Sequence, residues 1–339
     1  MTSSRSLRLL LVANPGEVHV GAHLLAAARR LDIPVRLVDA SRALSANRWI
    51  NSFCYHLRGH RPFHLHRVSG QVRAEAESFQ PTVLLATGMA AVEAEDLSAI
   101  GAMGVRTCNF LTDDPFNPFL ASRWFTTALP EYSTVFNPRR ANMDELRAAG
   151  CRDVRYLPFA YAPEVHFPEK PANPAEFESF VSDLYFVGAA DRDRIDYMAT
   201  LIREGFRLAL YGPFWHRYLR TRSAARGIAN AVTVRKGAAA AKIALCLVRR
   251  ANRDGHCMRT FELPAMHTCM VVEDTEEHRE IFGPDGECVV YFQTGEEMIA
   301  AVRRLVADNG ARARLADACH RRICAGGNTY QDRLVEMLR

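Results

Sequence analysis

The feature that most constrains the fold is an alternation of short apolar runs with helical patterns, which starts near the beginning of the chain. Its first set predicts strands at 9–13, 35–38, 82–86, 105–110 and 133–136. Helical patterns separate these runs, for example at 92–100 and at 142–149. Because alternating strands and helices are typical of βαβ units, the first half predicts one doubly wound parallel-sheet domain.

A proline-rich segment at 156–168 interrupts this alternation. It contains Pro158, Pro163 and Pro168 and has neither helical nor strand periodicity, which is typical of a linker. After it, the alternation restarts with predicted strands at 184–187, 207–211, 243–248, 270–272 and 289–291. Two domains are also expected because 339 residues exceed the usual size of one hydrophobic core.

We therefore predict the α/β fold class, with two Rossmann-like doubly wound parallel-sheet domains that face a cleft. The domains are expected at 1–165 and 166–325, and a C-terminal helix in 326–339 is expected to cross back to the first domain. Ligands bind at the carboxyl ends of the strands in such sheets. The loops after the strands are therefore the places to look for chemistry.

The composition is that of an ordinary soluble globular protein, and we expect a cytoplasmic location. Hydrophobic residues make up 48% of the chain and charged residues 24%, and no apolar stretch reaches the length of a membrane span. Nine cysteines are scattered singly without a C-x-x-C pair, which indicates a reducing compartment and argues against a structural zinc site. The net charge of +5 is mild and its signs are interspersed, so no nucleic-acid partner is expected.

The most informative segment is 252–266, which follows a strand and runs into a helix. A helix that begins near Met258 would direct free backbone N–H groups and its positive dipole end at a phosphate. Glu262, one turn later, could accept two hydrogen bonds from the vicinal hydroxyls of a ribose. The segment therefore predicts a nucleotide site, and the alternative for Glu262 is an acid on the helix surface.

Three segments resemble a known family: 259–262 (RTFE), 270–278 (MVVEDTEEH) and 328–333 (NTYQDR). They resemble the glycosyl transferases group 1 family, in its CgeB-like (spore-maturation protein) branch. The resemblance covers roughly residues 180–339 and extends weakly over the first half. It implies the GT-B fold, with a nucleotide sugar in the C-terminal domain, an acceptor on the N-terminal domain and no required metal or cofactor.

The resemblance also implies roles for single residues. The family carries two glutamates separated by seven residues, of which the second binds ribose and the first lies close to the donor sugar. The second falls on Glu262, and the first is replaced by Asp254, which shortens the side chain at that position. The sugar is expected near 254–257, and retention of anomeric configuration is implied. The donor contacts expected on this segment are His256, Cys257, Met258, Arg259 and Glu262.

A second phosphate site is predicted at 188–194, between a strand and a helix. Gly188 permits a close turn, and an arginine there can neutralise the diphosphate that leaves with the nucleotide. The family keeps a basic residue in this loop, so Arg194 and, second, Arg192 are the candidates. The alternative for Arg192 is a solvated charge at a helix start. Asp191-x-Asp193 imitates a metal-binding motif, but its Rossmann-like context argues against a metal site.

In the first half, Asp113 and Asp114 follow the strand that ends at Phe110. Glycosyl transfer needs either a base for the acceptor hydroxyl or donors that stabilise the leaving diphosphate. Both acids are therefore catalytic candidates, and the alternative is an Asp-Pro turn with a helix cap. The sequence does not separate the two.

Two further loops of the first half are secondary candidates for donor or acceptor contacts. The first is the loop after the first strand, with Gly16 and His19, although it does not match the dinucleotide fingerprint. The second is the turn Thr87-Gly88.

Residues 48–67 combine helical apolar spacing with arginines and histidines. One interpretation is a peripheral membrane surface at the inner face of the membrane that holds a lipid-linked acceptor. The interpretation that the sequence favours is a helix that packs against the core and has a solvated basic edge. A metal site at His60, His64 and His66 is disfavoured, because no carboxylate or cysteine completes it.

The function predicted from these residues is transfer of a sugar from a nucleotide-sugar donor, such as a UDP-sugar, to a glycan, lipid-linked or protein acceptor. One alternative is a nucleotide-sugar epimerase of the same fold, which needs no acceptor. Another is a binding protein that holds the nucleotide sugar without catalysis.

Overall fold

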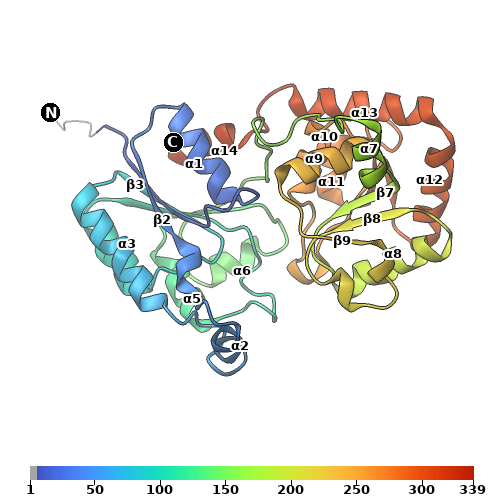
Figure 1. Ribbon diagram of the computed structural model, residues 1–339. Helices are drawn as coiled ribbons and strands as arrows, with labels where there is room; N and C mark the ends of the chain where they lie inside the picture. Colours follow the sequence, from blue (N-terminus) through green and yellow to red (C-terminus); the bar gives the residue numbers. More distant parts are fainter. Residues whose placement is uncertain (1–5) are drawn as a thin grey trace. The chain divides into compact units, whose positions relative to one another are not determined.

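The computed structural model describes residues 6–339, which form two compact units. The first unit comprises the chain up to Pro158, together with 251–253 and Tyr330–Arg339. The second comprises Phe159–Arg250 and Asp254–Thr329. Figure 1 shows the two sets of strands and helices. The main passage from one unit to the other thus falls at Pro158, inside the proline-rich segment.

The first unit contains a six-stranded parallel sheet. Its strands lie side by side in the order β2 (Val35–Asp39), β1 (Leu9–Ala13), β3 (Val83–Thr87), β4 (Arg106–Phe110), β5 (Thr134–Asn137) and β6 (Val154–Tyr156). From β1 the chain turns first to one side and then crosses to the other, so the strand order reverses between β1 and β3. Such a switch point is where parallel sheets bind ligands, beyond the carboxyl ends of the strands.

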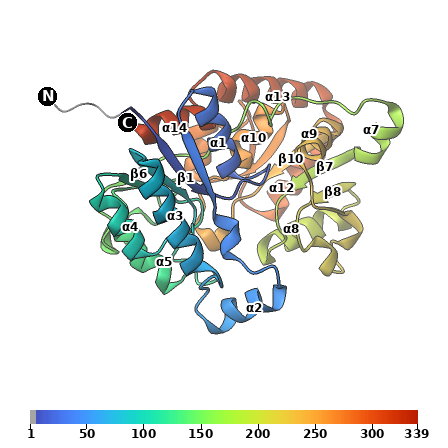
Figure 2. The same ribbon diagram turned by 60° about the vertical axis from the view of Figure 1, so that its left-hand side comes forward.

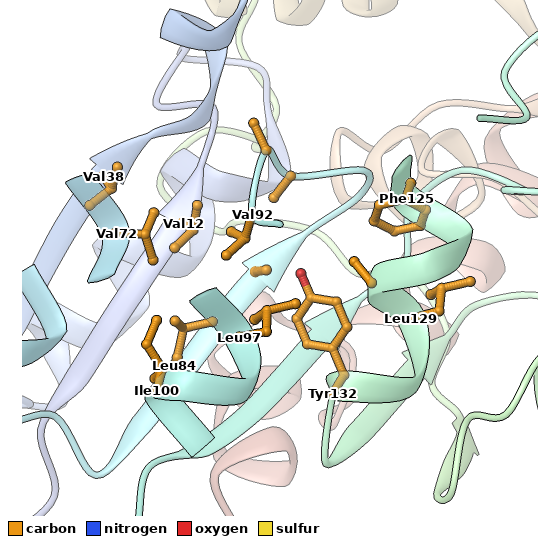
Figure 3. Packing of buried hydrophobic residues seen from close by; sticks show 14 of the residues in the cluster. Val12, Val38, Val72, Leu84, Val92, Leu97, Ile100, Phe125, Leu129 and Tyr132 are labelled. Atoms are coloured by element: carbon orange, nitrogen blue, oxygen red, sulfur yellow. The ribbon is translucent and has the colours of Figure 1, made fainter. Parts of the chain in front are cut away.

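The helices of this unit follow its strands. They are α1 (Val20–Arg30), α2 (Arg48–Leu57), α3 (Leu65–Phe79), α4 (Ala94–Ala102), α5 (Arg123–Ala128), α6 (Met143–Ala148) and α14 (Tyr330–Leu338), with the 3-10 turns η1 (Ala40–Ala43) and η2 (Leu129–Glu131). All five residues of β1 are buried, as expected for a central parallel strand. Val12 and Leu84 of the sheet pack in one cluster with Leu97 and Ile100 of α4 and with Tyr132 (Figure 3).

Helix α14 ends the sequence but belongs to the first unit. It packs against α1, where the rings of Tyr330 and His23 stack at 5.1 Å. Arg106 Nη2 donates to the carbonyl of Met337 at 2.6 Å, and Arg333 Nε donates to the carbonyl of Pro158 at 2.9 Å. These contacts tie both ends of the helix to the unit.

The second unit contains another six-stranded parallel sheet. Its strands lie in the order β12 (Val290–Phe292), β11 (Met270–Glu273), β10 (Ala241–Cys246), β7 (Ser182–Val187), β8 (Leu208–Tyr211) and β9 (Ala225–Gly227). This is the strand order of a Rossmann fold, and it reverses between β7 and β10. The α/β fold class with two doubly wound parallel sheets is thus confirmed.

The second unit has seven helices among its described residues. They are α7 (Pro174–Phe180), α8 (Arg192–Arg203), α9 (Ala231–Ala240), α10 (Arg259–Ala265), α11 (Glu276–Phe282), α12 (Gly295–Ala307) and α13 (Asn309–Cys324), with short turns η3 (Trp215–Arg217), η4 (Arg222–Ala224) and η5 (Arg250–Asn252). Leu184, Leu245 and Val271 of the strands share a buried cluster with Met198 and Val302. No helix in residues 6–339 is long and apolar enough to cross a membrane.

Several elements escape sequence analysis for physical reasons. The edge strands β6 and β9 have only three residues each and contain Arg155 and Arg226, so they lack an apolar run. Helix α7 has no buried residue and therefore no apolar period, although Asn173 caps it and Pro174 opens it.

The loops after β7 and β8 meet closely at Gly212, and Gly205 is a glycine with which it can be compared. Gly212 has a φ of +128°, and a Cβ placed on it would lie 2.2 Å from the carbonyl oxygen of Gly188. Gly205 also has a positive φ, +86°, but a Cβ there would have no atom within 4 Å. A substitution at Gly205 therefore adds backbone strain alone, whereas one at Gly212 adds backbone strain and steric overlap.

We expect Gly212→Ala to lower the free energy of unfolding by about 3–4 kcal/mol, from left-handed strain plus overpacking. Gly205→Ala is the matched control and is expected to cost about 1–2 kcal/mol, from strain alone. Urea unfolding followed by circular dichroism measures both. Equal losses in the two variants would show that the approach to Gly188 is unimportant.

Candidate functional site

The candidate site of the second unit lies at the carboxyl ends of β7 and β10. These strands are parallel neighbours, with Leu184 opposite Ile243. The chain leaves β7 through the loop 188–191 towards one side of the sheet, and it leaves β10 through 247–258 towards the other side. The two loops therefore diverge at the switch point, which is the ligand position that this topology favours.

Arg194 joins these two loops. Asp191 caps helix α8 by accepting from the Arg194 backbone N–H at 3.0 Å, which fixes the first turn. The Arg194 guanidinium then donates to the carbonyl of Ala189 at 3.3 Å and to that of Leu247 at 3.2 Å. Its Nε is buried and has no hydrogen-bond partner among the described residues. A buried cation with an unused donor at this place is suited to an anionic ligand.

The neighbouring arginine is placed differently. Arg192, the first residue of α8, is exposed, and Asp193 beside it is exposed as well. The Asp191 carboxylate is already used, because it caps α8 and forms an ion pair with Arg194 at 3.3 Å. The structure thus singles out Arg194 from the two candidates, and it assigns Asp191 to the helix terminus.

Glu262 lies on α10 and is only 1% exposed. Arg259, one turn earlier, forms an ion pair with it and also donates from Nε to the carbonyl of Val187 at 3.2 Å, at the end of β7. His166 Nε2 lies 3.6 Å from Oε1 of Glu262. His166 Nδ1 accepts from the Ala162 N–H, so in the neutral ring the proton is on Nε2 and faces the carboxylate. Glu262 is therefore buried among polar partners.

Helix α10 is short, with seven residues, and Met258 precedes it without a side-chain cap. The backbone N–H of Cys257 donates to Thr260 Oγ1 at 3.1 Å. One of the amides expected to bind phosphate is therefore already used. The guanidinium groups of Arg194 and Arg259, both expected from the sequence to contact the donor, remain as sources of positive charge.

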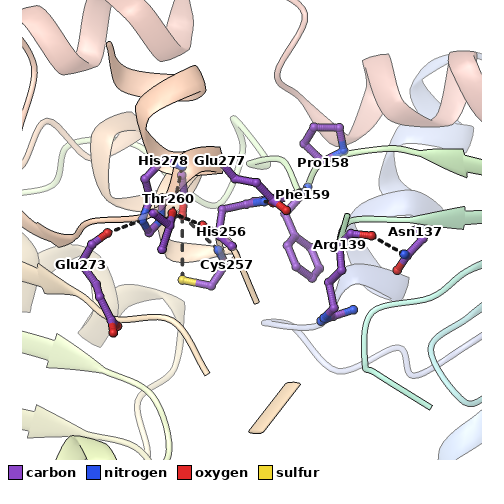
Figure 4. A network of polar contacts seen from close by, with 12 residues as sticks. Asn137, Arg139, Pro158, Phe159, His256, Cys257, Thr260, Glu273, Glu277 and His278 are labelled. Carbon is purple, nitrogen blue, oxygen red and sulfur yellow. Dashed lines mark hydrogen bonds and ion pairs between the residues drawn. The ribbon is translucent and has the colours of Figure 1, made fainter. Parts of the chain in front are cut away.

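A chain of hydrogen bonds runs behind this helix (Figure 4). His278 Nδ1 donates to the carbonyl of Glu273 at 2.7 Å, so its Nε2 accepts from Thr260 Oγ1 at 2.9 Å. Burial lowers the pKa of His278 to about 4 and keeps the ring neutral. The Glu273 carboxylate in turn accepts from the N–H of Val248 and from Arg250. These bonds hold the β10 loop and α10 in register.

His256 takes part in a second set of contacts, also drawn in Figure 4. Its Nε2 accepts from the N–H of Phe159 at 3.2 Å, so its Nδ1 carries the proton and donates to Glu277 at 2.5 Å. Gly255 leaves the room for this, because a Cβ there would lie 2.4 Å from the Glu277 carboxyl carbon. A ligand contact by His256 would have to break one of these bonds.

Cys246 and Cys257 form a thiol pair at the same edge of the sheet, with 3.8 Å between the sulfur atoms. The hydrogen bond from Cys246 lowers the pKa of Cys257 to about 5, and the charges of Arg194 and Arg259 act in the same direction against burial. The pKa of Cys246 is raised by the same contact and by burial. Sequence analysis missed this pair because the two residues are eleven apart and match no motif.

In the first unit, the structure separates Asp113 from Asp114. Asp114 is fully buried, and Arg253 reaches it with Nε at 2.8 Å and Nη2 at 2.7 Å. Asp114 also accepts from the N–H of Phe116 and from Asn142 Nδ2. Asp113 is only half-buried, and its contacts include Thr112 Oγ1 at 3.3 Å and Asn252 Nδ2 at 3.4 Å. Asp114 thus supports the turn, and Asp113 is the more exposed of the two acids.

Of the two secondary candidate loops, the turn at Gly88 lies near Asp113. Gly88 has a φ of +59°, and a Cβ on it would meet Thr112 Oγ1 at 2.7 Å and Asp113 Oδ2 at 3.8 Å. Gly16 and His19 follow β1, where the N–H of His19 donates to the Gly16 carbonyl at 2.9 Å. Arg139, which sequence analysis missed, is buried and donates to the carbonyls of Leu111 and Thr112.

The preferred interpretation of residues 48–67 is wrong. Helix α2 forms, but Trp49, Phe53 and Leu57 are exposed, and Cys54 is its only buried residue. The apolar period correctly predicted a helix, but a period does not say what covers its apolar face. His60 and His66 bind the carbonyl of Ala121 and the carboxylate of Glu93.

Comparison with known proteins finds a family match over the part of the chain that holds most of the second unit. A protein-family model described as "Glycosyl transferase-like" matches residues 193–339. The matched residues include Arg194, Arg259 and Glu262, whereas Gly188 lies five residues before the match. The match supports the glycosyltransferase prediction for this part of the chain, and no curated protein matches the chain in sequence.

Solved structures similar to the whole chain support the fold. Sucrose-phosphate synthase from Thermosynechococcus elongatus has a TM-score of 0.66 at 10% identity, covering 98% of this chain and 97% of its own. A putative UDP-N-acetylglucosamine 2-epimerase from Listeria monocytogenes has a TM-score of 0.59 at 13% identity, covering 96% and 93%. Anabaena HepE in complex with UDP has a TM-score of 0.56 at 12% identity, covering 97% and 98%. The GT-B fold is thereby confirmed.

Cys257 should react faster with iodoacetamide at mildly acidic pH than other accessible cysteines, because its lowered pKa keeps it a thiolate. Cys324 is the matched control, since it is similarly half-buried but its pKa is raised by burial. Mass spectrometry of the labelled peptides at about pH 6.5 measures both rates. Equal rates would mean that Cys246 and the arginines do not activate Cys257.

The buried His278 should make stability depend on pH. Its pKa of about 4 in the folded chain lies below the ordinary 6.5, so the unfolded chain binds a proton first as pH falls. The stability that neutral His278 provides is complete above pH 6.5 and is lost as pH falls towards about 4. Thermal melts of the wild type and of His278→Gln should diverge in slope over this window, whereas the exposed control His56→Gln should follow the wild type.

Proposed function

We propose that this chain is a metal-independent, retaining glycosyltransferase of the CgeB-like type that uses a nucleoside diphosphate sugar as its donor. The observation that carries the proposal is the meeting of Arg194, Arg259 and Glu262 at the switch point of the second sheet, within the residues that match the family model. Two cations and one acid beside the ends of β7 and β10 match a diphosphate beside a ribose.

The arginines supply what the leaving group needs. Cleavage of the bond between sugar and diphosphate leaves negative charge on the phosphate oxygens, and charge-assisted hydrogen bonds from guanidinium groups stabilise it. Arg194 is held by two carbonyls and keeps an unused Nε, so it is fixed before the donor arrives. Little reorganisation is then required during the reaction.

Glu262 and Arg259 exchange partners in this proposal. Without nucleotide, the Glu262 carboxylate is paired with Arg259. A ribose whose vicinal hydroxyls donate to Glu262 replaces that pair, and Arg259 then turns its free donors to the diphosphate. Gly188 allows the donor to approach the end of β7, and Asp254, His256, Cys257 and Met258 border the sugar.

Asp113 is the acceptor-side residue of the proposal. As a half-buried carboxylate in a loop at the carboxyl end of the sheet, it can accept a proton or a hydrogen bond from an acceptor hydroxyl. Asp114 holds the turn that presents Asp113. Gly16, His19 and Gly88 lie in loops of the same sheet edge and would border the substrate.

The nucleotide is proposed to be UDP, because the solved HepE structure of the same fold is a complex with UDP. The acceptor is a glycan, a lipid-linked saccharide or a protein. Epimerases of UDP-N-acetylglucosamine share this fold and support epimerisation as the second candidate. Incubation with a UDP-sugar alone, followed by proton NMR, separates the two, since an epimerase alters the sugar without any acceptor.

Glu262→Gln should weaken UDP binding by at least about thirtyfold, because a neutral amide cannot accept both ribose hydroxyls as a carboxylate does. The thermal shift produced by UDP measures binding through its stabilisation of the folded state. Glu296→Gln, on the exposed first turn of α12, is the control and should keep the full shift.

Asp113→Asn should keep the UDP shift and lose turnover of the UDP-sugar. Asp114→Asn should instead lower the melting temperature, because Arg253 then lacks its buried counter-ion. A normal UDP shift in Glu262→Gln would show that the nucleotide binds elsewhere and would end the proposal.

A further inference from the structure

Helix α2 leaves an apolar stripe open to solvent. Trp49, Phe53 and Leu57 follow one another at every fourth position and therefore share one face of the helix. Their exposed fractions are 70%, 53% and 73%. In both views of the chain, α2 stands at the edge of the first unit, away from its sheet (Figures 1 and 2). A helix of this kind contributes little to the core of the unit.

Other large apolar side chains close to α2 in sequence or by contact are exposed as well. Leu44 and Phe63 flank the helix in sequence and are exposed, and so is Phe119. Tyr55 Oη donates to the carbonyl of Phe119 at 2.7 Å, which attaches that loop to α2. Monomeric soluble proteins rarely leave several large apolar residues exposed together, and such patches mark interaction sites.

The same segment is strongly basic. Residues 40–74 contain six arginines and four histidines but no aspartate or glutamate. Arg48, Arg58 and Arg67 are exposed, and no acidic residue in 6–339 pairs with any of them. The Arg48 guanidinium lies over the ring of Trp49 at 4.7 Å. Apolar side chains rimmed by unpaired arginines are typical of helices that lie in the headgroup layer of a bilayer.

A pocket of about 470 Å³ adjoins the end of α2. Arg58, Arg61 and Arg123 line it, together with Trp124 and the acids Glu93 and Glu95. Arg61 and His66 hold Glu93 at 2.7 and 2.9 Å, so its charge is compensated. Arg58 and Arg123 have no ion-pair partner among the described residues and remain available for a phosphate group.

We propose that α2 and this pocket form a docking surface for an anionic lipid bilayer. The stripe enters the boundary between headgroups and acyl chains, and the pocket holds a lipid phosphate between Arg58 and Arg123. The bilayer contact stands independently of the catalytic proposal. That the acceptor is itself carried on a membrane lipid rests on the proposed glycosyltransferase function.

Charge favours a bilayer over a second copy of the chain. A symmetric dimer through α2 would bring two sets of unpaired arginines face to face, which is repulsive. Anionic headgroups instead attract each arginine near the surface, and they place no like charge against it. The apolar stripe in turn requires an apolar phase. A nucleic acid, although rich in phosphate, does not provide one.

The second unit offers a comparison surface. Leu219 and Ile228 are as exposed as the α2 residues, at 77% and 75%. They lie outside its helices and belong to no helical stripe. A double variant of these two residues therefore tests whether exposed apolar side chains alone are sufficient for binding.

The experiment is co-sedimentation of the full chain with vesicles of phosphatidylcholine, alone or with about 30% phosphatidylglycerol, at about 0.1 M salt. We expect binding to the anionic vesicles that is at least about tenfold tighter than binding to the neutral ones. Trp49→Ser/Phe53→Ser/Leu57→Ser and Arg58→Glu/Arg123→Glu should each reduce anionic binding at least about tenfold. Phe177→Ser/Arg304→Glu, at exposed positions of the second unit, is the matched control and should bind like the wild type.

Three outcomes would overturn the proposal: equal binding to neutral vesicles, unchanged binding in the α2 triple variant, or loss of binding in Leu219→Ser/Ile228→Ser alone. Light scattering after gel filtration adds a fourth, a dimer that the α2 triple variant dissolves. The UDP thermal shift, measured on the same variants, should stay intact. Failure of the bilayer contact and failure of the donor site are therefore read separately.

Discussion

The second unit depends on one guanidinium group placed between two diverging loops. Parallel strands β7 and β10 send the chain to opposite sides of the sheet, so nothing in the backbone ladder ties the loops that follow them. Arg194 does so, through the carbonyls of Ala189 and Leu247, and Arg259 adds a bond to Val187. Because Arg194 bonds to a carbonyl in each loop, removal of its side chain would loosen both loops at once.

Behind the arginines, the site is kept rigid by neutral hydrogen bonds. Thr260, His278 and the carbonyl of Glu273 form a line in which every donor has one acceptor. The tautomer of His256 is fixed in the same way, by the Phe159 N–H on one side and Glu277 on the other. Networks in which each group is satisfied specify one arrangement of the backbone. The charged side chains in front can therefore exchange partners while the supporting loops stay in place.

The fold was predictable because its cause is local. Each central strand is a run of apolar residues bounded by a turn, and each crossover helix has a helical period of apolar residues. Strands such as Leu9–Ala13 can therefore be recognised from the sequence alone. The edge strands β6 and β9 and the helix α7, which has no buried residue, could not be found this way, because they lack a regular pattern of buried apolar residues. Position along the chain also predicted which loops follow the central strands, and thus the neighbourhood of Arg194 and Glu262.

Roles of single residues were less predictable, since they depend on partners distant in sequence. Arg192 and Arg194 are two residues apart, yet only the structure shows one exposed and one buried. Asp113 and Asp114 became distinguishable through Arg253, which is 139 residues from Asp114. The burial of an apolar stripe is likewise a property of what lies opposite, which is why α2 was misjudged as a core helix.

The membership of 251–253 in the first unit has a consequence for inheritance and engineering. The sequence visits that unit three times, first up to Pro158, then for three residues and finally through α14. A fragment that stops at Pro158 would keep Asp114 buried without Arg253 and would leave α1 bare where Tyr330 stacks on His23. Recombination at a single point therefore cannot exchange this unit intact for another.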